Sequence, residues 1–353
     1  MKYFCVLPLA ALLAPAPYVS AAPNDITPRV GVIEIYGARK VPLAKIRAAV
    51  AANAGDPLPS RAMVEDRINK LPGVLASDVE AACCVDRRMV LYVGIEEKDE
   101  PHVEYHPEPI GDITLSGDLV SVYREFLDNV AGSIRGRNAD EDLTNGYSLM
   151  ADPECRRLQQ LFLPLVARDL TVIDRVLREC ADPDQRAAAA YLLQYGPRNP
   201  RSSAVIVNAL QYGLLDSDTR VREDANRALH AVMIGAKLHP DQQIRIEPTW
   251  YIELMNSLVW SDRRNASHAL VNLTDQNNPE TLRLVRERAL PSVIEVARWH
   301  DLQQALPAFI LAGRLAGMTD RQIDAAWVSG NREAVLKKAL HPAKKRAKDV
   351  EGE

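Results

Sequence analysis

This sequence of 353 residues contains few aromatic side chains and only a small excess of one charge sign. Phe, Trp and Tyr together make up 5% of the residues, so a folded core has to be built from Ala, Leu, Val and Ile. The formal net charge of −4 excludes a general positive field of the kind that attracts nucleic acid. The 47% hydrophobic and 25% charged residues are typical of a globular protein and exclude a wholly disordered or collagen-like chain.

Long apolar runs are scarce as well. The run at residues 3–14 follows Lys2 and falls short of the roughly 20 residues that span a membrane. Small residues at 19–21 come next, which completes the layout of a secretory signal peptide. We therefore expect residues 1–21 to be a signal peptide cleaved near Ala21. The mature protein is then periplasmic or secreted, without a membrane span.

Cysteine is equally scarce. Only four cysteines follow residue 21, which excludes a scaffold held together mainly by disulfides. Cys155 and Cys180 lie in residues 154–180, a stretch that looks like a helical hairpin turning near Arg168. Antiparallel helices would bring the two thiols face to face, so a disulfide between them is predicted, and two separate buried thiols are the alternative.

Cys83 and Cys84 are neighbours within a predicted strand. Successive side chains of a strand point to opposite faces, so an ordinary strand cannot pair them. We expect one buried and one exposed thiol, since a vicinal disulfide would need a distorted backbone.

The common catalytic motifs are missing. The sequence has no GxSxG, SxxK or HExxH motif and no phosphate-binding GxxxxGK[ST] loop. His102 and His106 lie among carboxylates, but the prolines around them disfavour the helix that would bring both imidazoles to one metal ion. We expect a protein that is not an enzyme and holds no cofactor or metal. A site assembled from residues distant in the sequence is the alternative.

Residues 26–98 mix strand and helix signals. A β-rich run at 30–37 is followed by helical apolar spacing at 42–55 and again at 61–73. Two further strands, 74–85 and 87–97, are joined as a hairpin near Asp86. The predicted order is β-α-α-β-β, with both helices covering one face of the sheet.

These residues resemble a POTRA domain, the small periplasmic module of outer-membrane assembly factors and of a cell-division protein. The resemblance rests on the strand ending at Ile35–Gly37, on the LPGV sequence at 71–74 and on the closing strand LYVGIEEK at 91–98. Val41, Gly55, Pro57 and Ser60 also match. The resemblance implies that a sheet edge, here at 77–85, accepts an added strand from β-rich outer-membrane or other envelope proteins.

The remaining chain divides by composition. Residues 99–117 form an acidic, Pro-rich linker, residues 118–150 a helical connector, and residues 151–340 read as helices throughout. Residues 341–353 are polar and lack apolar periodicity, so a disordered tail is predicted there.

The helical part contains an internal repeat. Three segments superpose with Arg186, Arg222 and Arg263 aligned at separations of 36 and 41 residues. Small or apolar residues follow each arginine at three and seven positions, which gives each helix one buried face. A second apolar stretch follows each copy, and a helix pair recurring at about 40 residues indicates an α-solenoid.

The copies resemble HEAT repeats, which are armadillo-like helical modules. Asp182 and Asp218 lie four residues before their arginines as in that family, whereas Val259 holds this place in the third copy. The segments 141–150, 255–270 and 286–299 are similar to secreted bacterial HEAT-repeat proteins of no assigned activity. The predicted fold class is therefore multi-domain, a small POTRA-like α+β domain followed by an all-α solenoid of HEAT-like helix pairs.

This architecture favours an exported, non-catalytic scaffold or adaptor that binds protein partners and no nucleic acid. Solenoids offer long faces along which a partner can lie, and a sheet edge can accept a strand. The candidate partner-binding residues are Asn226, Asn256 and Trp260. Two alternatives stay open: an exported hydrolase with a site between the domains, and a structural spacer.

Overall fold

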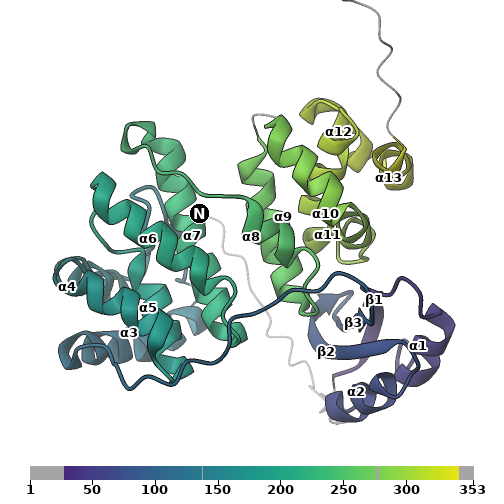
Figure 1. The fold of residues 1–353 in the computed structure, drawn as a ribbon, viewed down its shortest axis with the longest axis horizontal. Helices are drawn as coiled ribbons and strands as arrows, with labels where there is room; N and C mark the ends of the chain where they lie inside the picture. The colour runs from purple at the N-terminus through teal and green to yellow at the C-terminus, as the bar shows by residue number, and fades with distance from the viewer. Residues whose placement is uncertain (1–27, 137, 276–277, 342–353) are drawn as a thin grey trace, which may run out of the picture.

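The computed structural model of the protein describes residues 28–136, 138–275 and 278–341. These ranges contain thirteen α-helices and a small mixed sheet near the N-terminus (Figure 1). The predicted arrangement, α+β first and helices afterwards, is confirmed at this level. None of the described helices has the length and apolar character to cross a membrane. The predicted signal peptide, and nearly all of the predicted tail, lie outside the described residues.

The α+β unit, residues 28–98, has the predicted element order β-α-α-β-β. Its sheet has the order β1-β3-β2, with β1 parallel and β2 antiparallel to the central β3. The elements are β1 (Val30–Tyr36), α1 (Leu43–Val50), α2 (Arg61–Asn69), β2 (Val74–Val85) and β3 (Arg88–Glu97).

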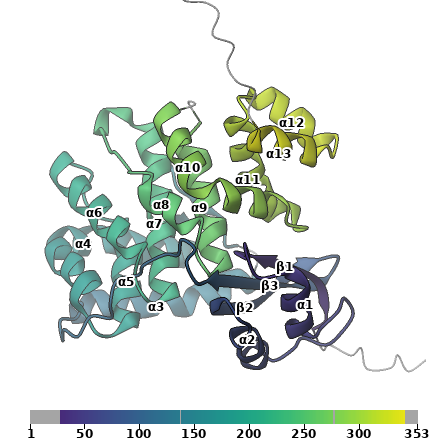
Figure 2. The same cartoon turned by 45° about the vertical axis from the view of Figure 1, so that its right-hand side comes forward.

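Strand β3 is buried on both faces. Leu91, Val93 and Ile95 pack into a small core with α1 and α2. Val90 and Tyr92 alternate with them, point to the opposite face and join the main core of the helical part. In Figures 1 and 2 the sheet accordingly lies against the helices, beside α9. The second sheet face is therefore an internal interface.

The helical part begins at residue 117. Its elements are α3 (Gly117–Arg135), β4 (Glu141–Asp142), β5 (Leu149–Met150), α4 (Pro153–Glu179), α5 (Pro183–Leu193), α6 (Pro200–Gly213), α7 (Thr219–Leu238), the 3₁₀ turn η1 (Pro240–Gln242), α8 (Thr249–Leu254), α9 (Trp260–Leu273), α10 (Pro279–Ala297), α11 (Leu302–Leu315), α12 (Asp320–Val328) and α13 (Arg332–Leu340). Helices α5, α7, α9 and α11 pack successively on one another in a first row. Helices α4 and α6, and likewise α8 and α10, pack together in a second row.

The first-row helices begin at residues that suit a helix start. Asp182, Asp218 and Asp301 are N-caps whose side chains accept hydrogen bonds from backbone N–H groups of the first turn. The N-cap of α9 is Val259, which has no such side chain, and the Ser257 hydroxyl accepts the N–H of Val259 itself. Helix α9 therefore lacks the side-chain cap of the other first-row helices.

The aligned arginines of the three copies are buried and form what we call the arginine ladder. Each is only 2–3% exposed and pairs with a carboxylate, which belongs to the following copy for Arg186 and Arg222 and to α10 of the same copy for Arg263. The pairs are Arg186–Asp216 at 2.8 Å, Arg222–Asp262 at 3.0 Å and Arg263–Glu295 at 3.1 Å between nitrogen and oxygen.

Each ladder arginine also holds the turn before its own helix. Arg186 donates to the carbonyls of Cys180 and Ala181, and Arg222 donates to those of Asp216 and Ser217. A buried guanidinium is tolerated only when its donors are satisfied, and here carboxylate and carbonyl oxygens do so together. The first two pairs therefore tie one copy to the next, and the third joins the two helices of the last copy.

The segment predicted as a linker, residues 99–117, packs along the helices. Tyr105 lies over the Arg222 guanidinium at 4.3 Å and donates to Asp262 at 3.0 Å. His106 stacks on Tyr212 at 4.0 Å, and further along the segment Gly111 pairs with Cys180. Figure 1 shows the segment crossing from the sheet back to α3. It therefore fixes the α+β unit to the repeats.

The predicted disulfide between Cys155 and Cys180 is wrong. Both are separate buried thiols. The predicted hairpin is instead one continuous helix, α4, with Pro164 inside it, so Arg168 marks no turn. Because a helix rises about 1.5 Å per residue, cysteines 25 positions apart at its two ends lie roughly 37 Å from each other.

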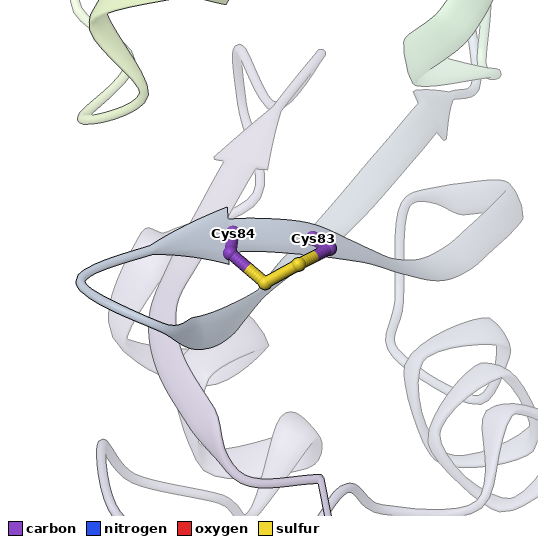
Figure 3. The surroundings of a disulfide bond; sticks show 2 residues. All are labelled: Cys83 and Cys84. Carbon is purple, nitrogen blue, oxygen red and sulfur yellow. A yellow bond between two sulfur atoms is a disulfide. The ribbon is translucent and has the colours of Figure 1, made fainter. Parts of the chain in front are cut away.

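The expectation for Cys83 and Cys84 is also wrong. Both residues are exposed, and their sulfur atoms are joined in a vicinal disulfide near the end of β2 (Figure 3). The regular register of β2 against β3 shifts between Ala82 and Val85. The backbone there is not an ordinary strand, so the alternation argument does not apply.

Replacing a ladder arginine should destabilise the fold far more than replacing an exposed one. Arg222→Ala leaves Asp262 buried without its partner, so we expect a loss of about 3–5 kcal/mol in the free energy of unfolding, measured by urea denaturation. Arg283→Ala is the control, because this arginine pairs with Glu280 and Glu287 at the surface. It should lose less than about 1 kcal/mol. Equal losses of stability in the two variants would contradict the stabilising role of the buried Arg222–Asp262 pair.

The interface between sheet and helices should depend on Gly94. A Cβ atom at this position would lie 2.0 Å from the Leu258 carbonyl oxygen. Gly94→Ala should therefore open the interface, cost roughly 1–3 kcal/mol and speed hydrogen exchange around Leu258. Gly132→Ala is the matched control, since a Cβ there meets open space in α3, and should stabilise by about 0.5–1 kcal/mol. An unchanged hydrogen-exchange rate around Leu258 in Gly94→Ala would contradict the dependence of this interface on Gly94.

Candidate functional site

Two of the three predicted partner-binding residues serve internal contacts. Trp260 is buried, and its ring stacks on Tyr92 at 4.4 Å between centroids. Its expected role as a partner-binding side chain is therefore wrong, because the sheet already covers it. The Asn256 amide donates to the Arg288 carbonyl at 3.0 Å and accepts from Ser292 at 2.7 Å, which joins the start of α9 to α10.

The aromatic contact around Trp260 extends across the interface. Tyr36 of β1 contacts Trp299 at 5.7 Å and donates its hydroxyl to the Leu258 carbonyl at 2.9 Å. The Arg263 guanidinium lies 4.6 Å from the centre of the Tyr36 ring. At the edge of the same interface, the Nδ1 atom of His300 lies 2.9 Å from a Glu34 carboxylate oxygen. The region between the units is thus packed with side chains.

The third predicted residue, Asn226, lines a polar cavity of about 490 Å³ between α7 and α9, called here the α7–α9 cavity. Its side chains come from one face of each helix, at spacings of three and four residues. They are Glu223, Asp224, Asn226, Arg227 and His230 from α7, and Arg264, Asn265 and His268 from α9. Asn226 therefore lies where a partner could reach it, and its role stays a prediction.

Two neighbouring cavities share lining residues with the first. One of about 590 Å³ lies among α3, α5 and α7, and one of about 190 Å³ lies beside α3 and the β4–β5 hairpin. Asp224 lines all three cavities, and Tyr123 and Leu127 of α3 line both of the latter. The three cavities adjoin one another over α3, α5, α7 and α9 and are together called here the groove.

The α3 side of the groove is apolar. Tyr123, Leu127, Val130 and Ile134 follow one another at helical spacing and all line the 190 Å³ cavity. Leu127 is 47% exposed and Ile134 is 61% exposed. Helix α3 therefore presents apolar side chains to solvent beside the polar cavity.

Burial shifts the pKa values of ionisable side chains on α7 and α9. It raises the pKa of Asp224 to about 7, against the attraction of Arg227, which favours the charged form. Burial also lowers the pKa of His230 and of His268, because the charged imidazolium is the form that is desolvated. All three shifts favour the uncharged form of the side chain.

The two arginines of the α7–α9 cavity differ in their partners. Arg227 forms an ion pair with Glu141 of β4. Arg264 donates to the Asn265 side chain at 3.1 Å and lies 5.7 Å from the Trp260 ring, and within the described ranges it forms no ion pair. Its charge is therefore available to an anionic group entering the cavity.

Of the side chains that α7 contributes to this cavity, Asn226 was predicted from the sequence, and its neighbours Asp224, Arg227 and His230 were not. Their spacing of three and four residues along the Asn226 face is the signal that could have found them. No local signal points to Tyr123 and Leu127, because α3 is brought to α7 only by tertiary packing. Tyr36 and Tyr105, which lie over ladder arginines, were missed for the same reason.

Among the residues that the structure describes, no group of three or more His, Cys, Asp or Glu side chains is placed to hold a metal ion. No protein-family model, no curated protein and no solved structure matches the chain.

The titration of Asp224 should appear in the pH dependence of stability. The folded protein retains a proton that the unfolded chain releases near pH 3.8, so this group makes the fold less stable as pH rises from about 4 to about 7. Asp224→Asn removes that loss. Relative to the wild type, the variant should gain roughly 2–3 kcal/mol between pH 5 and pH 8 in urea denaturation.

Asp241→Asn removes an exposed carboxylate on η1 and provides the control. It should follow the wild-type pH profile. An Asp224→Asn profile parallel to that of the wild type would show that Asp224 is ionised in the fold at pH 5.

Proposed function

We propose that this protein is an exported, non-catalytic scaffold that binds protein partners in the groove over α3, α5, α7 and α9. The observation that carries the proposal is the meeting of three cavities at Asp224, with polar side chains on α7 and α9 and exposed apolar side chains on α3. A depression with an apolar wall and a few converging polar groups is the usual form of a binding site.

The fold assignment within this proposal is an α-solenoid of HEAT-like helix pairs behind a POTRA-like unit. The ladder at Arg186, Arg222 and Arg263 supports the solenoid, because the aligned positions occupy equivalent places in successive copies. The element order and the strand order β1-β3-β2 support the POTRA-like unit. Rigid stacked pairs hold such a groove open along the array.

The sheet edge is the weaker of the two predicted surfaces. Strand β2 is an edge strand, but its Val79 N–H already donates to the Glu65 carboxylate of α2 at 3.0 Å. An added strand along 77–85 would have to displace this contact or begin beyond it. We therefore propose the groove, rather than the sheet edge, as the main binding surface.

Export is supported by the signal-peptide layout of residues 1–21 and by the exposed disulfide between Cys83 and Cys84. Disulfides persist in oxidising compartments such as the periplasm and the cell exterior.

Site-specific photo-crosslinking in the source cell tests the proposal. A photoreactive residue at Leu127 or His268, both exposed in the groove, should give discrete adducts with envelope proteins, identified by mass spectrometry. The same residue at Arg283, exposed on α10, is the control and should give none of these adducts. A scaffold acting through the groove is excluded if the groove positions give no adduct, or if Arg283 gives the same ones.

A further inference from the structure

The groove has a charge distribution that selects among partners. Arg264 lines the α7–α9 cavity and has no carboxylate partner in the described ranges, whereas Arg227 in the same cavity is already paired with Glu141. A partner carboxylate could approach Arg264 without displacing an existing ion pair. An Arg–carboxylate contact in a recess is a strong, charge-assisted interaction.

The apolar wall lies next to this charge. Asp224 and Arg227 line both the α7–α9 cavity and the 190 Å³ cavity that receives Leu127 and Ile134. Both α3 side chains are largely exposed, so covering them would remove apolar area from water. One ligand can therefore contact the apolar wall and the unpaired guanidinium at the same time.

We propose that the groove binds an extended peptide segment of a partner protein in which apolar side chains pack on Leu127 and Ile134 and a nearby carboxylate binds Arg264. This inference rests on the proposed scaffold function and names the chemistry of its partner.

The cavity disfavours a polyanion. Glu223 lines it together with Arg264, and Arg227 is already paired with Glu141, so a run of phosphates or a nucleic acid would find one unpaired guanidinium and a like charge in the same cavity. A single carboxylate needs only that one guanidinium. Asn226, whose side chain offers a donor and an acceptor, suits the amide groups of a peptide backbone.

The probe is a synthetic library of acetylated twelve-residue peptides that combine Leu, Ile or Phe with one Asp or Glu at varied spacing. A matched library carries Asn or Gln in place of the acid. Binding to the full chain is measured by fluorescence anisotropy. The best acidic peptides should bind at least about tenfold more tightly than their amide counterparts, since one charge-assisted hydrogen bond corresponds to about that factor.

Variants of the chain separate the two halves of the proposed site. Arg264→Gln should weaken the acidic peptide about tenfold and abolish the discrimination between acid and amide, whereas Arg264→Lys should retain part of it. Leu127→Ser should weaken acidic and amide peptides equally. Arg283→Gln, on the outer surface of α10, should bind like the wild type. Thermal unfolding of each variant establishes that the fold is intact.

The inference is overturned if Arg264→Gln binds acidic peptides as the wild type does, or if amide peptides bind equally well. It is also overturned if no library peptide binds, or if anionic lipid vesicles bind in an Arg264-dependent way while peptides do not. If the photoreactive residue at Leu127 still gives adducts with envelope proteins, the proposed scaffold function stands although the peptide inference has failed. If it gives no adducts, the scaffold function itself is excluded.

Discussion

The structure depends on buried arginine–carboxylate pairs that repeat along the chain. Removing a guanidinium from water costs several kcal/mol, and only a full set of acceptors offsets that cost. Arg186 and Arg222 each meet a carboxylate of the next copy and two carbonyls of their own preceding turn. Because both contacts have to form together, each pair sets the position of one copy relative to the next.

The last pair of the ladder also positions the α+β unit. The Glu295 carboxylate receives Arg263, forms an ion pair with Arg39 and accepts the Gly37 N–H at 3.2 Å. Tyr36 covers Arg263 much as Tyr105 covers Arg222. The sheet and its connecting segment thus use the same arginines that join the helical copies. One face of the sheet is covered by this contact.

The periodic features were predictable because they are local. Arg186, Arg222 and Arg263 were aligned from spacing alone, and all three prove to be buried and paired. The element order β-α-α-β-β followed from apolar periodicity and turn residues. The turn predicted near Arg168 is absent, because α4 continues through Pro164 and past Arg168 as one helix. The vicinal disulfide was also missed, since β2 loses its regular register there.

The sequence by itself determined the repeat and the order of strands and helices in the α+β unit, because these depend on neighbours within a few residues or on a fixed period. Only the tertiary structure decided that Trp260 is covered by Tyr92, that Arg264 remains without a carboxylate in the described part of the chain, and that α3 lies beside α7. Such packing brings together residues that are far apart in the sequence, as Tyr92 and Trp260 are. Their formation depends on how whole elements pack, which no local pattern encodes.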